Sequence, residues 1–306
     1  PLIKKMRFIV TFLPILSILL QITGCSQDPI NYETQLYNKN NFYYKKTQSK
    51  PYTGPIFSLY PNGKKKNSGN LLNGKKDGLW TEWFQNGKIK AEEYYKDGKA
   101  DGIWVSWYEN NKLKLKGTFK DGKVNGLRTE WYQNGQKKEE GYFKNNEFNG
   151  QWTKWYPNGE KSGEGNYKNN KETGKHTLWY QNGQKKSEAQ FVNGEIKGSR
   201  IEWYENGGKK EEGTINGLWT QWYENSYKKG EGHYKNQIPI GKHMLWHENG
   251  QKKSEMQFTN GRPHGLRIEW YENGQKKEEG NFVNGNQHGK WTYYNKDGTI
   301  DGTEEY

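Results

Sequence analysis

A glycine opens a similar stretch of sequence every 24 residues along most of this chain. The one shorter interval, between Gly198 and Gly217, lacks five residues. Self-similarity at a fixed period indicates a repeat protein, in which each unit packs on its neighbours in a row. We therefore predict about eleven units in residues 51–306, opened by Gly54, Gly78, Gly102, Gly126, Gly150, Gly174, Gly198, Gly217, Gly241, Gly265 and Gly289.

Each unit contains two turn signals that separate strand-like segments. With the opening glycine as position 0, the unit that begins at Gly126 has Trp131 at position 5, followed by Asn134-Gly135. A second aromatic residue, Phe143 at position 17, precedes another turn. Asn-Gly favours a type I′ hairpin turn because both residues tolerate a positive φ. The pattern predicts an all-β fold, an elongated array of antiparallel β-hairpins with roughly twenty-two strands in a meander.

The composition is unusual for a globular protein, since hydrophobic residues make up only 30% of the chain while aromatic residues reach 15%. Low hydrophobicity and high charge are typical of disordered chains, but such chains are poor in aromatic residues. A repeat array that buries a row of aromatic side chains reconciles the two observations. The net charge of +13 would suit an anionic surface, whereas mixed runs such as Lys137-Lys138-Glu139-Glu140 favour a solvated face.

Strand alternation places positions 1, 3 and 5 of each unit on one face of the sheet, the odd face. Positions 2, 4 and 6 lie on the other, the even face. Position 5 hardly varies among the copies, which favours a structural role. We interpret it as a packing spine on which copy stacks on copy, formed by Trp83, Trp107, Trp131, Trp155, Trp179, Trp203, Trp222, Trp246 and Trp270.

Position 2 varies from copy to copy, and such variation is expected where a binding surface is tuned. Trp, Tyr and Arg dominate the hot spots of protein interfaces. We therefore predict a contact face in which the Tyr side chains at position 6 accompany the row at position 2. That row consists of Trp80, Trp104, Arg128, Trp152, His176, Arg200, Trp219, His243, Arg267 and Trp291.

A block of three units is duplicated within the chain. The order Trp, His, Arg at position 2 of the three units in residues 150–216 is repeated in residues 217–283. The five-residue deletion lies at the seam between the two blocks, and it removes the second turn of its unit. We therefore predict a kink or an irregular hairpin at residues 209–217.

The pattern G-x-W-T-x-W-Y-x-N-G-x-K, as at Gly78–Lys88 and Gly150–Lys161, closely resembles the MORN-repeat variant of bacterial proteins, a family often labelled antitoxin-like. The resemblance covers about residues 51–302. It implies a β-hairpin solenoid or an elongated curved sheet that serves as a scaffold or a binding surface. In eukaryotic MORN proteins it implies binding to membrane phospholipids or to partner proteins.

The predicted function is therefore that of a non-enzymatic scaffold or a protein- or envelope-binding surface. One alternative is a cell-wall or glycan-binding module, because Gly289–Asn295 is also similar to choline-binding and cell-wall-binding repeats. Another alternative is an antitoxin or immunity protein that neutralises a toxin. The family label suggests this role, but a lipid-anchored exported chain fits a cytoplasmic antitoxin poorly.

The sequence contains no glycine-rich phosphate loop and no nucleophile elbow. His243 and His247 are four residues apart, and on a strand that spacing separates them by roughly 13 Å, too far to share one metal. Carboxylates are numerous but lie within mixed Lys-Glu runs. We expect no catalytic residues, no cofactor, no metal and, for an exported chain, no nucleic-acid partner.

Residues 1–24 have the features of an export signal. A basic start is followed by the apolar segment Phe8–Ile22, expected as a signal helix and too short to span a bilayer comfortably. The ending Ile22–Cys25 resembles the bacterial lipobox, in which the cysteine is lipidated and becomes the first mature residue. A plain secretory signal and a retained anchor helix are the alternatives.

Cys25 is the one cysteine of the chain, so an intrachain disulfide is impossible. More than one acyl chain at Cys25 would give stable membrane anchoring. Residues 25–50 are polar, and we interpret them as a tether, with an irregular cap for the first repeat, ahead of the repeat domain at 51–306. The predicted location is a bacterial envelope membrane, the outer membrane if the source is Gram-negative.

Lipidation of Cys25 is directly testable. Cells that express the chain and are fed a radioactive fatty acid should label the wild-type protein, because the acyl chains attach at this thiol, and should not label Cys25→Ala. Equal labelling of the two proteins would exclude the anchor.

Overall fold

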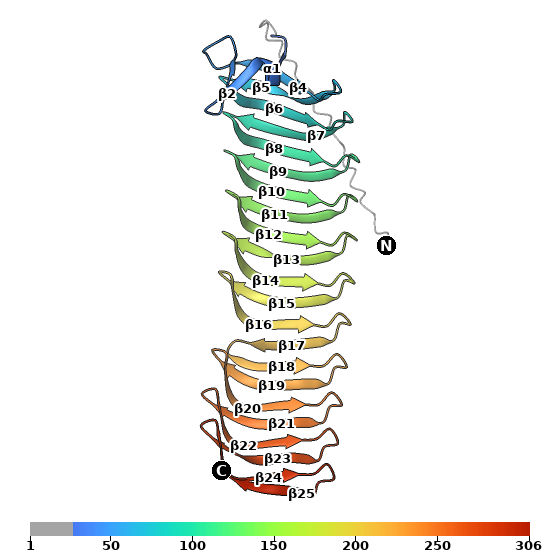
Figure 1. Ribbon diagram of the computed structural model, residues 1–306, viewed down its shortest axis with the longest axis vertical. Helices are drawn as coiled ribbons and strands as arrows, with labels where there is room; N and C mark the ends of the chain where they lie inside the picture. The colour runs from blue at the N-terminus through green and yellow to red at the C-terminus, as the bar shows by residue number, and fades with distance from the viewer. Residues whose placement is uncertain (1–26) are drawn as a thin grey trace, which may run out of the picture.

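The computed structural model describes residues 27–306, so the predicted signal segment 1–24 and Cys25 lie outside the described residues. Within the described part, β1 and β4–β25 form one sheet of 23 strands, and β2 and β3 form a separate pair. The array is one sheet thick and far longer than it is wide (Figure 1). The predicted all-β array of antiparallel hairpins is confirmed.

The elements divide into a short N-terminal group and the repeat strands. The first group is β1 Ile30–Asn31, α1 Tyr32–Gln35, β2 Leu36–Lys39 and β3 Phe42–Lys45. The repeat strands up to the deletion are β4 Gly54–Leu59, β5 Lys65–Leu72, β6 Lys75–Trp83, β7 Ile89–Lys96, β8 Lys99–Trp107, β9 Leu113–Lys120, β10 Lys123–Trp131, β11 Lys137–Lys144, β12 Glu147–Trp155, β13 Lys161–Lys168, β14 Lys171–Trp179, β15 Lys185–Val192 and β16 Glu195–Trp203. The remainder are β17 Lys209–Thr214, β18 Gly217–Trp222, β19 Lys228–Lys235, β20 Ile238–Trp246, β21 Lys252–Thr259, β22 Arg262–Trp270, β23 Lys276–Val283, β24 Asn286–Tyr294 and β25 Ile300–Glu305.

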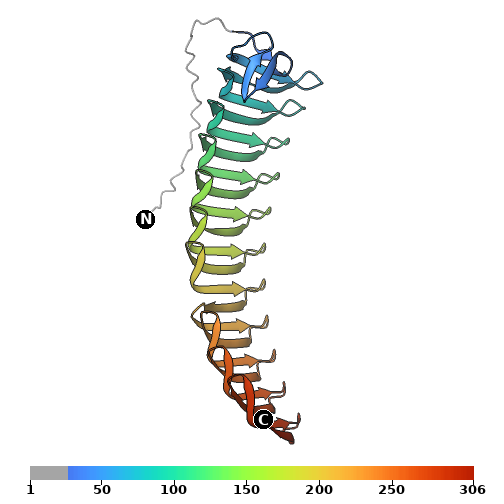
Figure 2. The ribbon, with the colours of Figure 1, turned by 60° about the vertical axis from the view of Figure 1, so that its left-hand side comes forward.

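Each strand from β4 to β25 pairs antiparallel with the next strand in sequence. The exception is β1, which lies parallel to β4 with Ile30 opposite Ile56. Since neighbouring strands are about 4.8 Å apart, each hairpin lengthens the array by about 10 Å. The array curves along its length (Figure 2). A meander of this kind makes its contacts between neighbours in sequence, as the repeat pattern predicts.

The two turns of a unit belong to different types. In the first, Gly135 has a φ of +92° and its N–H donates to the Tyr132 carbonyl at 2.8 Å. That geometry is a type I turn closed by a left-handed glycine. In the second, Asp121 and Gly122 have φ values of +50° and +81°, which a type I′ turn requires. The type I′ prediction is therefore right for the second turns, which include Asn193-Gly194, and wrong for the first turns, such as Asn134-Gly135.

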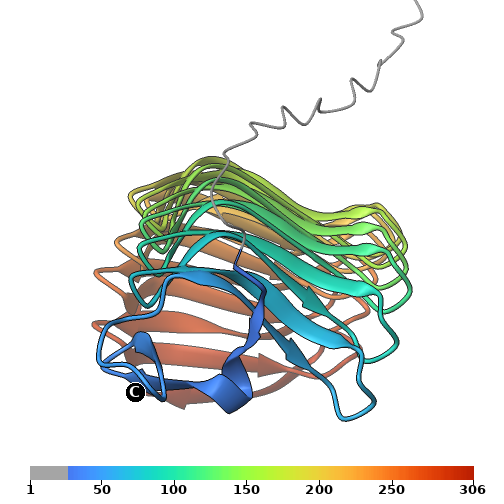
Figure 3. The same ribbon diagram turned by 90° about the horizontal axis from the view of Figure 1, so that it is seen from above.

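Two register shifts bend the strands of a regular unit. Where β12 pairs with β11, the register shifts between Gly141 and Phe143, opposite the opening Gly150, whose φ is +142°. Where β12 pairs with β13, it shifts again between Lys154 and Trp155. Bulges increase local twist and bending. Seen from above, the strands are accordingly curved rather than straight (Figure 3).

A small cap built from β1, α1, β2 and β3 closes the N-terminal end. Leu36 and Tyr52 pack with Ile56, Leu71 and Trp80 in one buried cluster. Because Ile56 and Trp80 occupy position 2, the cap covers the even face of the first units. Residues 30–45 therefore form a folded cap, where the sequence predicted a tether with an irregular cap. The burial of apolar side chains on the first repeats explains why this segment folds.

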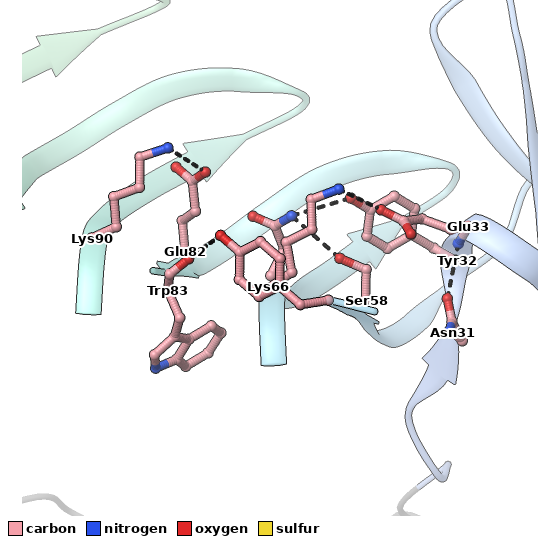
Figure 4. Close-up of polar contacts among 10 residues, drawn as sticks. Asn31, Tyr32, Glu33, Ser58, Lys66, Glu82, Trp83 and Lys90 are labelled. Carbon is pink, nitrogen blue, oxygen red and sulfur yellow. Dashed lines mark hydrogen bonds and ion pairs between the residues drawn. The ribbon is translucent and has the colours of Figure 1, made fainter. Parts of the chain in front are cut away.

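Polar contacts orient the cap on the first hairpin (Figure 4). The Lys66 ammonium donates to the Glu33 carboxylate at 3.0 Å, although both side chains are well exposed. The Asn67 amide donates to the Ser58 hydroxyl at 3.3 Å and to the Tyr32 hydroxyl at 3.4 Å. The exposed ion pair contributes little stability, so the part-buried amide contacts are the more informative ones for the cap's position.

The shortened unit forms a regular narrow hairpin in place of the predicted kink or irregular hairpin. β17 and β18 have six residues each and are joined at Ile215-Asn216. Their register runs without a shift from the Glu211–Gln221 pair to the Gly213–Trp219 pair. The deletion removes the outer part of both strands together with the bulge, and sheet pairing continues through the seam.

The close contact between a ring and the position-15 glycine can be tested directly. A Cβ at Gly280 would lie 2.3 Å from the Trp291 ring, whereas one at Gly302, at position 13 of the last unit, would meet nothing within 4 Å. Gly280→Ala should lower the free energy of unfolding by about 1–3 kcal/mol through overpacking. Gly302→Ala is the matched control and should change it little. Denaturant unfolding measures both, and equal effects would contradict the close ring contact.

Candidate binding surfaces of the repeat array

Apart from Trp104, which faces Glu93, the position-2 rings follow a glycine at position 15 of the preceding strand. Trp291 covers Gly280, and His176 covers Gly165. A Cβ at either glycine would fall 2.3 Å from a ring atom. The contact buries both rings, since Trp291 is 0% exposed and His176 is 8% exposed. Glycine at position 15 thus makes room for a flat side chain from the next strand.

Hydrogen bonds hold several of these rings at their polar edge. The Trp80 Nε1–H donates to the Asn70 carbonyl at 3.0 Å, and the His176 Nε2 is 2.8 Å from the Asn166 carbonyl. Because a carbonyl only accepts, this histidine nitrogen carries the proton. The acceptor is at position 16 of the preceding strand in both cases. The ring is therefore fixed to its neighbour by shape and by hydrogen bonding.

Aromatic residues at position 17 complete the row on the even face. The His176 ring lies 5.2 Å from the Tyr167 ring and 5.0 Å from the Phe191 ring, edge-on to both. The Phe282 and Trp291 ring centroids are 5.2 Å apart. Edge-to-face contacts of this kind stabilise a pair by about 0.5–1.5 kcal/mol beyond area burial. Position 17 therefore packs with position 2 on the even face.

One lysine lies inside this row near the cap. The Lys76 ammonium is 4.2 Å from the Trp80 ring centroid and 4.5 Å from that of Tyr95. Burial lowers the pKa of Lys76, although Glu93 and Glu82 act in the opposite direction. Burial raises the pKa of Tyr95, and so does the hydrogen bond that its hydroxyl donates to Glu93.

Where position 2 is arginine, two glutamates of the same unit face it. Arg267 pairs with Glu269, and its Nη1 is 3.2 Å from a Glu278 carboxylate oxygen. These glutamates are at positions 4 and 13. The units of Arg128 and Arg200 carry glutamate at the same two positions. The arginine charges are therefore neutralised within the sheet.

Positions 4 and 13 change together with position 2. Beside His243 they are Leu245 and Ser254. Beside Trp152, position 13 is Gly163, where a Cβ would lie 2.9 Å from the indole. The residues at positions 4 and 13 thus change to fit the residue at position 2. Such coupled changes are expected for side chains that pack against one another.

Three residues of the expected contact row are packed inside the array. Trp80, His176 and Trp291 are buried and cannot belong to an exposed contact face. The other members of that row are half-buried, namely Trp104, Arg128, Trp152, Arg200, Trp219, His243 and Arg267. The expected spine at position 5 is also only half-buried throughout, at Trp83, Trp107, Trp131, Trp155, Trp179, Trp203, Trp222, Trp246 and Trp270. The separation of faces was predictable, but which face packs more tightly was not.

Lysines partly cover the tryptophans of the odd face. The Lys137 ammonium lies 5.4 Å from the Trp155 ring centroid and 2.7 Å from a Glu140 carboxylate oxygen. Similar lysine contacts recur at Trp83, Trp179, Trp203, Trp222, Trp246 and Trp270. The hydrogen bond from Lys242 is the largest cause that lowers the pKa of Glu255, a carboxylate of the same ladder. Lys-Glu pairs therefore make this face polar and solvent-accessible, as the mixed charge runs predict.

The tyrosines at position 6 join one unit to the next. The Tyr132 hydroxyl donates to the Trp155 carbonyl at 2.9 Å, and the Tyr156 hydroxyl donates to the Trp179 carbonyl at 2.7 Å. The Asn158 side chain adds a bond to the Gln181 carbonyl at 3.2 Å. Because these hydroxyls are engaged between repeats, the tyrosines have a structural role that the sequence did not indicate.

The odd face of the N-terminal units exposes a strip of apolar side chains. Its members are at positions 1 and 16, which pair across each hairpin, as Leu79 does with Tyr94. Each is 39–49% exposed. This apolar strip runs over β6–β11 and consists of Leu79, Tyr94, Ile103, Leu127 and Tyr142. Position 1 becomes polar in the three following units, at Gln151, Lys175 and Ser199.

Charge is also distributed unevenly along the array. Residues 27–125 contain 18 Lys against 10 Asp and Glu, whereas residues 126–306 contain 27 Lys and Arg against 25 Asp and Glu. The excess positive charge of the described chain therefore lies mainly in the N-terminal third. The apolar strip begins in this basic region.

A groove of about 500 Å³ opens on the even face at the shortened unit. Arg200, Trp219 and His243 line it, and all three belong to the predicted contact row. Ile196 and Tyr234 lie at its sides. Sequence reasoning located the deletion but did not predict a cavity there, because the cavity depends on how far the neighbouring hairpins extend past the short one.

The described part of the chain has neither a metal-binding cluster nor a membrane-spanning helix. Among residues 27–306, no group of three or more His, Cys, Asp or Glu side chains could hold a metal ion. No helix in the same range has the length and apolarity needed to cross a membrane.

The fold and these surfaces define an open, single-layer β-repeat array that presents two long faces. The MORN repeat variant matches residues 76–97, 100–121, 124–145, 148–169, 172–193, 239–260 and 263–284. The chain belongs to the MORN repeat variant family. The unmatched interval contains the shortened unit.

Comparison with individual proteins adds little to this assignment. No curated protein matches the chain. Two solved structures are similar at 10% identity, described as TcdB2-TccC3-Cdc42 and TcdB2-TccC3-TEV, with TM-scores of 0.19 and 0.18. The matches cover 78% and 87% of this chain but only 14% and 16% of those chains.

The co-varying residues of the even face can be exchanged as a set. Arg267→His alone should destabilise the array by about 1–3 kcal/mol, because it leaves the Glu278 carboxylate without its cation and crowds the new ring against Met256, the residue opposite it on β21. Adding Met256→Gly, Glu269→Leu and Glu278→Ser creates the combination found around His243, whose ring lies over Gly232, and should recover most of the loss. Thermal unfolding of the single and quadruple variants measures this. A quadruple variant less stable than the single one would contradict the coupling.

Proposed function

We propose that this protein is a non-enzymatic scaffold, held at an envelope membrane by lipidated Cys25, that binds a protein partner. The observation that carries the binding role is the apolar strip on the odd face. Its side chains lie on consecutive hairpins and are 39–49% exposed. Exposed apolar patches rimmed by polar residues mark interaction sites in soluble proteins. The family assignment supports a repeat-based binding or scaffold role.

The size of the apolar strip suits a protein interface. It extends over six strands, β6–β11, and therefore over about 25 Å of the array. A standard interface buries about 800 Å² on each partner, with an apolar centre and a polar rim. Ile103 and Leu127 lie near its middle and supply that centre. Lys116 and Lys123 on β9 and β10 provide cations near it.

The charge distribution favours an acidic partner. The strip begins in the basic N-terminal third, where Lys outnumbers Asp and Glu by 18 to 10. Opposite charge on the partner would accelerate association and favour the correct orientation. A partner of this kind would meet the array close to its predicted lipid anchor, since only residues 26–53 separate Cys25 from the first repeat.

The packing of the even face favours a protein partner over a glycan. Glycan-binding modules present free aromatic rings, but Trp80 and Trp291 are buried here. An antitoxin or immunity role would also require a protein partner, and nothing in residues 27–306 favours a toxin over another acidic protein.

The experiment uses the lipid-free chain from residue 26 as bait in envelope extracts. Ile103→Asp with Leu127→Asp should reduce capture of the bound protein at least ten-fold, because the change places charge at the centre of the strip. Leu218→Asp with Leu266→Asp alters the same position in later units, where both leucines are 47% exposed, and should leave capture unchanged.

Two results would overturn the proposal. One is capture that responds equally to both pairs of substitutions. The other is retention of the chain by sedimented peptidoglycan in place of any protein, which would support the glycan alternative. Circular dichroism of each variant checks that the array remains folded.

A further inference from the structure

The groove at the shortened unit lies where most units place an aromatic ring. Position 17 is Tyr or Phe in nine units and Leu71 in the first. In the unit opened by Gly198, position 17 is Ile215, which lies in the turn between β17 and β18 and is 40% exposed. The deletion removes the residues that follow it, together with the regular second turn. The aromatic row therefore has a gap at this unit.

The neighbouring hairpins do not close this gap. Ile196 on β16 and Tyr234 on β19 line opposite sides of the groove, and Gln237 lies in the turn beyond β19. Trp219 and Leu245 also line it. Its volume of about 500 Å³ falls within the range of ligand-binding sites. An aromatic side chain fits easily in this space.

Trp219 lacks the contacts that the corresponding ring makes in a regular unit. His176, at the same position of a regular unit, contacts the ring of the preceding unit and that of its own, at 5.2 and 5.0 Å. No aromatic ring pair within residues 27–306 includes Trp219. Within the same residues its indole N–H makes no hydrogen bond, whereas that of Trp80 donates to a carbonyl. Trp219 therefore presents both a ring surface and a free donor.

The groove is close to neutral despite its arginine. Arg200 pairs with Glu202, and its guanidinium is 3.8 Å from a Glu211 carboxylate oxygen. Ile215 and Leu245 are 40% and 44% exposed on its lining. A neutral group with an apolar ring suits these surroundings better than a charged group does, since a charge would lose its hydration without a free counterion.

We propose that this groove binds a Phe or Tyr side chain of a partner protein, which takes the place of the ring that position 17 supplies in other units. The bound ring would contact Trp219 as position-17 rings contact position-2 rings elsewhere in the row. A Tyr hydroxyl would reach the polar side chains of the lining, among them Gln221 and Gln237. The inference rests on the proposed binding role of the array but uses the opposite face from the apolar strip.

The test uses N-acetyl-phenylalaninamide and N-acetyl-tyrosinamide as probes of the full repeat domain. Binding is followed by NMR at the Trp219 indole N–H, whose signal is assigned by its loss in Trp219→Phe. A dissociation constant on the order of millimolar is expected, which corresponds to about 4 kcal/mol for a single side chain. N-acetyl-alaninamide and N-acetylglucosamine should shift the signal much less.

A repeat-restored variant provides the sharpest comparison. Replacing the three residues 214–216 with the chain's own residues 190–197 restores the 24-residue period and places a Phe in the gap. This variant should bind the aromatic probes at least ten-fold more weakly, and its melting temperature should not fall. Leu218→Ala changes the opposite face of the same strand and should bind the probes like the wild type.

Three outcomes would overturn the inference. The first is equal probe binding by the wild type and by a folded repeat-restored variant, and the second is a response to N-acetylglucosamine as strong as that to the aromatic probes. The third is an unperturbed Trp219 signal at every probe concentration. If the restored variant does not fold, Ile215→Trp fills the groove from within and takes its place. Ile103→Asp with Leu127→Asp should leave probe binding intact. A negative result for partner binding at the apolar strip can therefore be distinguished from a negative result for probe binding in the groove.

Discussion

The array has a single layer of sheet, and this constraint explains most of its side-chain chemistry. A domain normally buries the apolar face of a sheet against a second layer. Here the neighbours within the sheet supply the cover, and the tightest example is the Trp291 ring over Gly280. Since such contacts join one unit to the next, a single hairpin would leave its rings exposed. Stability is therefore a property of the stack.

The ends of the stack and its seam follow from the same constraint. At the N-terminal end, Leu36 and Tyr52 of the cap region cover the even face. In the last unit the Tyr306 ring packs 6.2 Å from the Trp291 ring. At the shortened unit the smaller Ile215 stands where other units have a ring, and the groove forms there. Continuous pairing of β17 with β18 keeps the sheet intact across it.

Variation among repeats has two physical origins in this protein. At position 2 it is compensated inside the sheet, since Arg267 is accompanied by Glu269 and Glu278. At position 1 the side chain faces solvent, and the change from Leu127 to Gln151 is accompanied by a change from Tyr142 to Asn166 in the cross-strand partner, which is also exposed. The second kind of variation is the one that a partner can use. A comparison of the copies in the sequence distinguishes these two kinds of variation only when the side chains that each position contacts are known.

The repeat period, the all-β class, the number of strands and the separation into two faces follow from the sequence alone. Glycine and Asn-Gly spacing and strand alternation are local properties, so they are visible in the chain order. Which face packs more tightly was decided by the tertiary structure. Trp80 is buried because Gly69 on the preceding strand leaves space for its ring, whereas Trp83, which has the ammonium of Lys65 over its ring, is half-buried. Those contacts depend on the register between neighbouring strands. The bulges set this register, and it cannot be deduced from the sequence of one strand.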